Sequence, residues 1–125
     1  MSASCAGACV LGVMAVCAAG CGPSVAPYDP ALARSLYVTN GCVPCHGDEG
    51  RGDGGLAPTL TPRPRDFRDA AAFKYGRDVE RVAHTIASGL IAYPTPMPAY
   101  GHLSLEDRRQ LAAYVLSLSG RGLAP

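Results

Sequence analysis

Two segments in the second half of the chain carry apolar side chains at helical spacing. After Asp78, apolar residues recur at positions i, i+3, i+4 and i+7, and the same spacing returns after Ser104: Val79, Val82, Ala83 and Ile86, then Leu111, Tyr114, Val115 and Leu118. This period places them on one face of a helix. Asp and Ser are favoured N-caps, and Gly89 and Gly120 stand where helices commonly end. Two amphipathic helices are therefore predicted.

Weaker patterns predict two further helices. Pro30 is favoured in a first helical turn, and four apolar residues follow it at helical spacing: Leu32, Ala33, Leu36 and Tyr37. A short helix over 69–75 is closed by Gly76. The stretch 47–55 holds five glycines and no apolar residue, so it must be a loop. No segment alternates as a strand does, so we expect an all-α domain of three to five helices.

The first 30 residues differ in composition from the rest. Residues 5–20 are uncharged and mostly small or apolar, which predicts a signal peptide over 1–20 rather than a membrane span. Its end, Ala18-Ala19-Gly20-Cys21, resembles a bacterial lipoprotein signal, in which Cys21 becomes the lipidated N-terminus. An ordinary secretory signal and an uncleaved anchor are the alternatives. The proline-rich stretch 21–30 is then a flexible tether, 31–120 the folded domain and 121–125 a tail.

The charge balance limits the kinds of partner. The chain has 11 Lys and Arg against 10 Asp and Glu, a formal net charge of +1. A protein this close to neutral lacks the basic surface that nucleic acid requires, and its association with other proteins is only weakly steered. We therefore expect no nucleic-acid partner.

One pentapeptide carries the most specific chemistry. Cys42-Val43-Pro44-Cys45-His46 reads C-x-x-C-H, the signature of covalent c-type haem attachment. Two thiols at this spacing can add to the two vinyl groups of one porphyrin, and the adjacent imidazole then becomes the proximal iron ligand. The alternatives are a redox dithiol, half of a zinc site or a disulfide. A redox dithiol would need a βαβ context, and a zinc site would need further Cys or His ligands at short spacing; the sequence shows neither.

The second axial ligand is predicted from a proline-rich loop. Residues 93–100 read Y-P-T-P-M-P-A-Y, whose prolines prevent a helix. Met97 is the only methionine outside the leader, so its thioether is the candidate for the sixth coordination site. The alternative is gap-filling core packing. His84 falls on the polar side of its helix, whereas His102 is near enough in sequence to compete with Met97.

A basic stretch precedes the second half of the chain. Thr61 to Arg68 reads T-P-R-P-R-D-F-R, with arginines at positions 63, 65 and 68. A guanidinium matches carboxylate geometry, so at least one of them, of which Arg65 is our candidate, is expected to bind a haem propionate. The alternative is a solvated basic loop.

From Leu32 to Leu118 the chain resembles the class I monohaem c-type cytochromes. The order is helix, C-x-x-C-H-G, glycine-rich loop, Ala57-Pro58-Thr59-Leu60, helix, proline-flanked Met and final amphipathic helix. The resemblance implies one covalent haem c, with thioethers at Cys42 and Cys45 and axial ligands His46 and Met97. It also implies that the Pro58 carbonyl accepts the proximal imidazole N–H, and that the first and last helices cross at Ala33, Tyr37 and Tyr114.

These features predict a one-electron carrier rather than an enzyme. Both axial positions are filled, so no site is left for a substrate. We expect an exported protein, periplasmic or at the cell surface, held to a membrane through Cys21 and serving redox partner proteins that the sequence does not identify. The alternatives are a subunit of a larger oxidase, reductase or dehydrogenase, a gas sensor from which Met97 dissociates, and a peroxidase, for which a distal His with a supporting Arg is missing.

Lipidation of Cys21 is tested on the native N-terminus. Mass spectrometry should find acyl chains on Cys21. We expect two or more chains, because a single chain does not anchor a protein stably. Cys21→Ser should yield soluble or unprocessed protein. A mature chain that starts elsewhere without lipid would refute the anchor and leave export intact.

Overall fold

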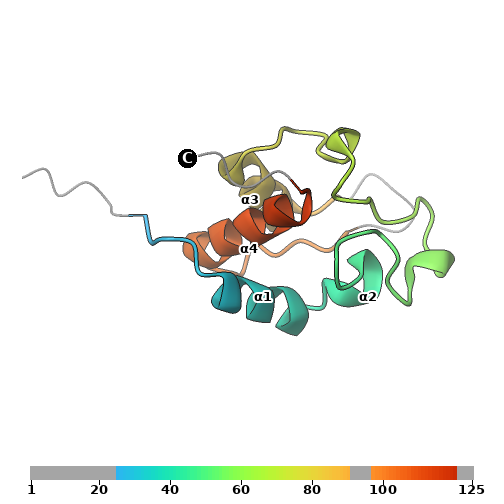
Figure 1. The fold of residues 1–125 in the computed structure, drawn as a ribbon, viewed down its shortest axis with the longest axis horizontal. Helices are drawn as coiled ribbons and strands as arrows, with labels where there is room; N and C mark the ends of the chain where they lie inside the picture. The colour runs from blue at the N-terminus through green and yellow to red at the C-terminus, as the bar shows by residue number, and fades with distance from the viewer. Residues whose placement is uncertain (1–24, 91–96, 121–125) are drawn as a thin grey trace, which may run out of the picture.

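The computed structural model describes residues 25–90 and 97–120 (Figure 1). The predicted signal peptide, residues 21–24 of the tether and the tail lie outside these ranges. The helices are α1 (Pro30–Thr39), α2 (Val43–His46), α3 (Val79–Ser88) and α4 (Leu105–Leu118), with short 3₁₀ helices η1 (Ala57–Thr59) and η2 (Ala70–Ala72). Within the described ranges, strand-like pairing is confined to one isolated bridge between Leu90 and Met97. The all-α prediction is confirmed.

The three long helices begin at the capping residues that the sequence indicates. The Asp29 carboxylate accepts from the backbone N–H of Ala31 at 2.9 Å, and Asp78 accepts from that of Arg81 at 2.9 Å. The Ser104 hydroxyl accepts from the N–H of Asp107 at 3.0 Å. Each cap satisfies a backbone donor that has no partner within its helix.

The helix expected over 69–75 is only the 3₁₀ turn η2. Asp69 caps this turn through the N–H of Ala71, but the backbone leaves helical geometry at Phe73. Phe73 packs against the hydrophobic core. A single helical turn has little stability of its own, so this contact outweighs the local propensity.

Helix α4 is the centre of the packing. It lies between α1 and α3 in Figure 1, and both pack against it. The core formed by the three helices consists of fully or nearly fully buried side chains: Tyr37, Val82, Ala83, Ile86, Leu111, Ala112, Val115 and Leu116. The apolar stripes predicted for α3 and α4 therefore face each other across the core.

The crossing of α1 and α4 uses the three predicted residues. Ala33 is fully buried, and the rings of Tyr37 and Tyr114 lie with their centroids 5.1 Å apart at 58°. The buried Tyr37 hydroxyl donates to the carbonyl of Gly47 at 2.8 Å. The crossing thus also fixes the residue that follows His46.

Gln110 joins the start of the domain to α4. It is 4 % exposed. Its amide oxygen accepts from the N–H of Asp29 at 2.8 Å, and its amide nitrogen donates to the Pro27 carbonyl at 2.9 Å and to Glu106 at 3.0 Å. The rigid domain therefore begins at Pro27, within the expected tether. No described helix is long and apolar enough to span a membrane.

The Gln110 contacts should contribute measurably to stability. Gln110→Ala removes all three hydrogen bonds of a buried side chain, including the part-buried bond from the N–H of Asp29, and we expect the free energy of unfolding to fall by about 1–3 kcal/mol. Urea unfolding of the mature protein measures this change. Ser117→Ala, which removes an exposed hydroxyl from the same helix, is the matched control and should cost less than about 0.5 kcal/mol. Equal effects of the two variants would contradict the role given to Gln110.

Candidate functional site: the C-x-x-C-H segment and the Met97 loop

The C-x-x-C-H segment forms the four-residue helix α2, which backbone contacts from both sides hold in place. The N–H of Cys42 donates to the Tyr37 carbonyl at 3.1 Å, so α2 follows directly from the end of α1. The glycine-rich loop then returns over α2, and its N–H groups bind three carbonyls of the helix. These bonds are Gly52 to His46 at 2.9 Å, Gly54 to Cys45 at 3.2 Å and Leu56 to Pro44 at 2.8 Å.

The return of this loop requires a glycine at position 54. A Cβ atom there would collide with the backbone carbonyls of Val43 and Pro44. Backbone can approach a helix this closely only where the residue has no side chain. The glycines of 47–55 therefore wrap the loop around α2, as the composition predicts.

The predicted haem ligands meet at two adjoining cavities. The first, which we call the motif cavity, has a volume of about 470 Å³ and is lined by Cys42, Cys45, His46 and Met97 together with the Pro62–Arg65 stretch. The second, the inner cavity, has a volume of about 100 Å³ and extends from the same segment into the core, where Phe67, Phe73, Val82 and Ile86 line it. Six residues line both cavities: Cys42, His46, Arg65, Leu90, Met97 and Tyr100.

His46 is held by ring stacking and burial. Its imidazole stacks on Phe67, with ring centroids 4.6 Å apart and 23° between the planes. Burial lowers the pKa of His46, while a hydrogen bond with the Arg65 backbone acts in the opposite direction. Nδ1 is buried and has no hydrogen-bond partner among the residues described. Nδ1 is therefore available for the hydrogen bond to a backbone carbonyl that the sequence predicts for it.

The predicted hydrogen bond to Pro58 is not formed in this structure. Pro58 lies in η1, which packs against α2, but the Pro58 carbonyl is not a partner of Nδ1. The His46 ring is oriented by Phe67 instead. The role of Pro58 therefore stays a prediction for the haem-bound chain.

The two thiols lie at the wall of the motif cavity. Cys42 and Cys45 are both free and half-buried. Burial, with a smaller contribution from Cys45, raises the pKa of Cys42 to about 11. Within the described ranges no group of three or more His, Cys, Asp or Glu side chains is arranged to hold a metal ion.

Met97 reaches the cavities through contacts with the end of α3. The N–H of Leu90 donates to the Met97 carbonyl at 3.1 Å. Gly89 has a φ of 65°, and a Cβ atom there would lie 2.6 Å from the Met97 carbonyl oxygen, so only glycine fits. The rivals of Met97 line neither cavity: His84 is exposed on α3, and His102 is exposed with its ring against Tyr100.

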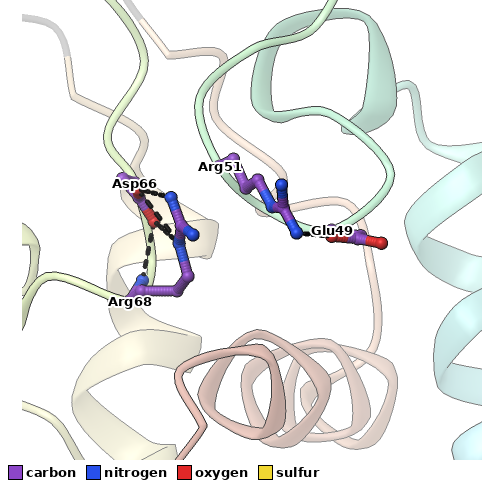
Figure 2. Close-up of polar contacts among 4 residues, drawn as sticks. All are labelled: Glu49, Arg51, Asp66 and Arg68. Atoms are coloured by element: carbon purple, nitrogen blue, oxygen red, sulfur yellow. Dashed lines mark hydrogen bonds and ion pairs between the residues drawn. The ribbon is translucent and has the colours of Figure 1, made fainter.

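The three arginines of the basic stretch divide into two groups. Arg65 lines both cavities and Arg63 lines the motif cavity. Arg68 instead donates to Asp66, with Nη2 at 2.5 Å, and this bond lowers the pKa of Asp66 to about 2. Figure 2 shows this ion pair and the pair formed by Glu49 and Arg51. Arg68 is thus engaged away from the cavities.

Sequence reasoning did not find three aromatic residues of the site. Phe67 stacks on His46, and the Tyr37 and Tyr100 hydroxyls bind the backbone on either side of the motif. The only sequence signal is the position of Tyr100, three residues after Met97. Phe67 stands in a loop of no regular pattern.

The fold and these ligands define a small all-α domain suited to a covalently attached haem. The family model for cytochrome c matches residues 30–119. The chain therefore belongs to the cytochrome c family. Members of this family carry covalently bound haem c, and the two cavities, with the free thiols of Cys42 and Cys45 in their walls, fit that cofactor.

Relatives and solved structures agree with this family. The chain is 35 % identical over 100 residues to the cbb3-type cytochrome c oxidase subunit FixP of Bradyrhizobium diazoefficiens, covering 78 % of this chain and 30 % of FixP. It is 33 % identical over 94 residues to the subunit CcoP of Rubrivivax gelatinosus, covering 75 % and 27 %. A reducing HAO-like protein complex of Kuenenia stuttgartiensis matches with a TM-score of 0.61 and 27 % identity, over 75 % of this chain and 45 % of that one. The chain thus spans under a third of the length of these curated relatives.

Covalent attachment is tested by extraction. Protein made with a c-type maturation system should keep its haem through acid–acetone extraction and denaturing electrophoresis, because thioethers survive both. The double variant Cys42→Ala, Cys45→Ala should release it, whereas the control Cys21→Ser, which removes a thiol outside the motif, should retain it. Haem that washes out of the wild-type protein would refute covalent attachment.

Proposed function

We propose that this chain carries single electrons through one haem c bound to Cys42 and Cys45. The observation that supports this most is that Cys42 and His46 line the same two cavities as Met97, which follows His46 by 51 positions. The bound haem would supply the redox chemistry, with its iron alternating between the ferrous and ferric states. The sequence contains a single C-x-x-C-H motif, which supports one haem per chain.

In this proposal the protein positions the haem and restricts access to it. His46 and Met97 would take the two axial positions, which leaves none for a substrate and favours a carrier over an enzyme. The Phe67 and Phe73 side chains, with α3 and α4 behind them, would give one side of the site an apolar, water-poor surrounding. Such a surrounding disfavours the more highly charged ferric state.

Arg65 is the residue we propose for a haem propionate. It lines both cavities, its side chain is exposed at their edge, and its Nη1 donates to the Ala71 carbonyl at 3.2 Å. A guanidinium donates through several N–H groups, so one such bond leaves others for a carboxylate. Arg63 is the second candidate because it lines the motif cavity alone.

We propose further that the protein is exported and anchored through a lipid on Cys21. The support is the uncharged leader ending in Ala18-Ala19-Gly20-Cys21 and the proline-rich stretch that follows it. C-type haem attachment also takes place on exported chains. Redox partner proteins would then be found at the membrane surface.

A second function is a cytochrome subunit within a larger complex. The relatives FixP and CcoP are named as subunits of a cbb3-type oxidase, and the Kuenenia match is part of a protein complex. In that case the electron would pass to a fixed partner subunit instead of a diffusing protein. A partner that stays bound through detergent extraction and purification distinguishes this function from a free carrier.

The sixth ligand decides where on the potential scale the carrier works. Met ligation raises the potential relative to His ligation and gives a weak sulfur-to-iron charge-transfer band in the oxidised spectrum. We expect this band in the wild type. Met97→Ala should abolish it, open the ferrous iron to CO, and lower the potential by part of the roughly 0.8 V range that axial ligands span.

The two histidines are the matched controls for this experiment. His84→Ala and His102→Ala should both leave the band unchanged, because neither residue lines the cavities. An unaltered low-spin spectrum in Met97→Ala, together with a high-spin spectrum in His102→Ala, would show that the axial pair is bis-histidine.

A further inference from the structure

Two tyrosine hydroxyls bind the backbone on either side of the C-x-x-C-H segment 42–46, which we call the attachment segment. Tyr37, from α1, donates to the carbonyl of Gly47, directly after His46, at 2.8 Å. Tyr100, from the loop that follows Met97, donates to the carbonyl of Asn40, two residues before Cys42, at 3.0 Å. The first bond lies wholly on the His46 side of the site. The second joins the segments that carry the two proposed axial ligands.

The acceptor of the Tyr100 hydroxyl is itself firmly held. Asn40 is the C-cap of α1, and both its backbone N–H and its side-chain amide donate to the Leu36 carbonyl, at 3.0 and 2.9 Å. Because α1 packs on α4, the Asn40 carbonyl is part of the rigid frame of the domain. A bond to this carbonyl therefore restrains whatever segment donates it.

Tyr100 passes this restraint to Met97. Its backbone N–H donates to the Ile86 carbonyl of α3 at 2.9 Å, and its side chain lines both cavities together with Met97. On the other side of Met97, the N–H of Leu90 donates to the Met97 carbonyl. Met97 is thus held at its backbone by Leu90, just after α3, whereas the Tyr100 hydroxyl provides a side-chain hydrogen bond from the Met97 loop to Asn40.

We propose that Tyr100 is a positioning residue for Met97. Its bond to Asn40 fixes the Met97 loop relative to the attachment segment and so raises the effective concentration of the thioether at the sixth coordination site. This inference rests on the proposed function, in which Met97 is an axial ligand. In this proposal Tyr100 neither binds the iron nor takes part in electron transfer.

The test is competition between Met97 and added imidazole for ferric iron. Tyr100→Phe removes one oxygen atom and keeps the ring, so the haem-loaded protein should fold with its normal haem content. A tenfold weaker Met97 bond, equivalent to about 1.4 kcal/mol, raises the apparent affinity for imidazole about tenfold. The charge-transfer band, followed in the same titration, should disappear at correspondingly lower imidazole concentrations.

Tyr37→Phe is the matched control because it removes the same group from the other flank. It also removes a hydrogen bond from a more deeply buried ring, although the Gly47 carbonyl keeps the N–H of Gly50, so this variant should cost global stability as well. The Tyr37 hydroxyl bonds Gly47 on the His46 side, and Tyr37→Phe keeps the ring that lines the inner cavity with Met97, so the imidazole affinity should stay within about twofold of the wild type. Urea unfolding measures the free energy of unfolding of both variants. Comparison with their imidazole affinities then distinguishes a loss of global stability from a weaker Met97 bond.

Each result has a distinct meaning. An imidazole affinity raised about tenfold in Tyr100→Phe alone supports the positioning role. Equal affinities in the two variants, whether raised or unchanged, would overturn it, because the hydroxyl would then act only on general stability or not at all. A wild-type protein without the charge-transfer band would refute Met97 as the ligand and this inference with it. If the wild type has the band, a negative result in Tyr100→Phe refutes only the positioning role of Tyr100.

Discussion

The fold of the site depends on contacts that stabilise helix α2, because a helix of four residues is not stable alone. In the proposed function α2 and the residue before it would hold two thiols and an imidazole against the haem, yet a single turn of helix has little stability in isolation. The surrounding chain supplies that stability through hydrogen bonds to the α2 carbonyls from Gly52, Gly54 and Leu56. The crossing of α1 and α4 adds to it, because the Tyr37 hydroxyl at this crossing binds the Gly47 carbonyl.

The two sides of the site are built differently, and the difference suits the two ligands. The His46 side is made of contacts close in sequence, within residues 37–67, and it would be tied further by covalent attachment. The Met97 side depends on contacts with distant segments, namely the Ile86 carbonyl and, 60 residues away, the Asn40 carbonyl. A thioether is a weak ligand, so its occupancy depends on such restraint far more than that of the imidazole.

The sequence predicts the parts of this structure that follow from local rules. Asp78 and Ser104 cap their helices as expected, the α3 and α4 stripes face the core, and the order of segments indicates the cytochrome c family. It could not predict that Tyr100 would bind Asn40 or that Phe67 would stack on His46, because neither contact has a period or a motif. Over 69–75, a long-range contact of Phe73 outweighed local helix propensity.

The segment that leads into the folded domain is attached to α4, away from the two cavities. Gln110 binds Pro27 and Asp29 against α4, so the segment that precedes the domain is fixed at a defined point. None of these three residues lines the motif cavity or the inner cavity. A leader, a lipid anchor or another domain can therefore be joined there without occupying the site. The same arrangement suits a tethered carrier and a domain that spans under a third of a longer oxidase subunit, because in both cases the attachment point and the redox site must remain separate.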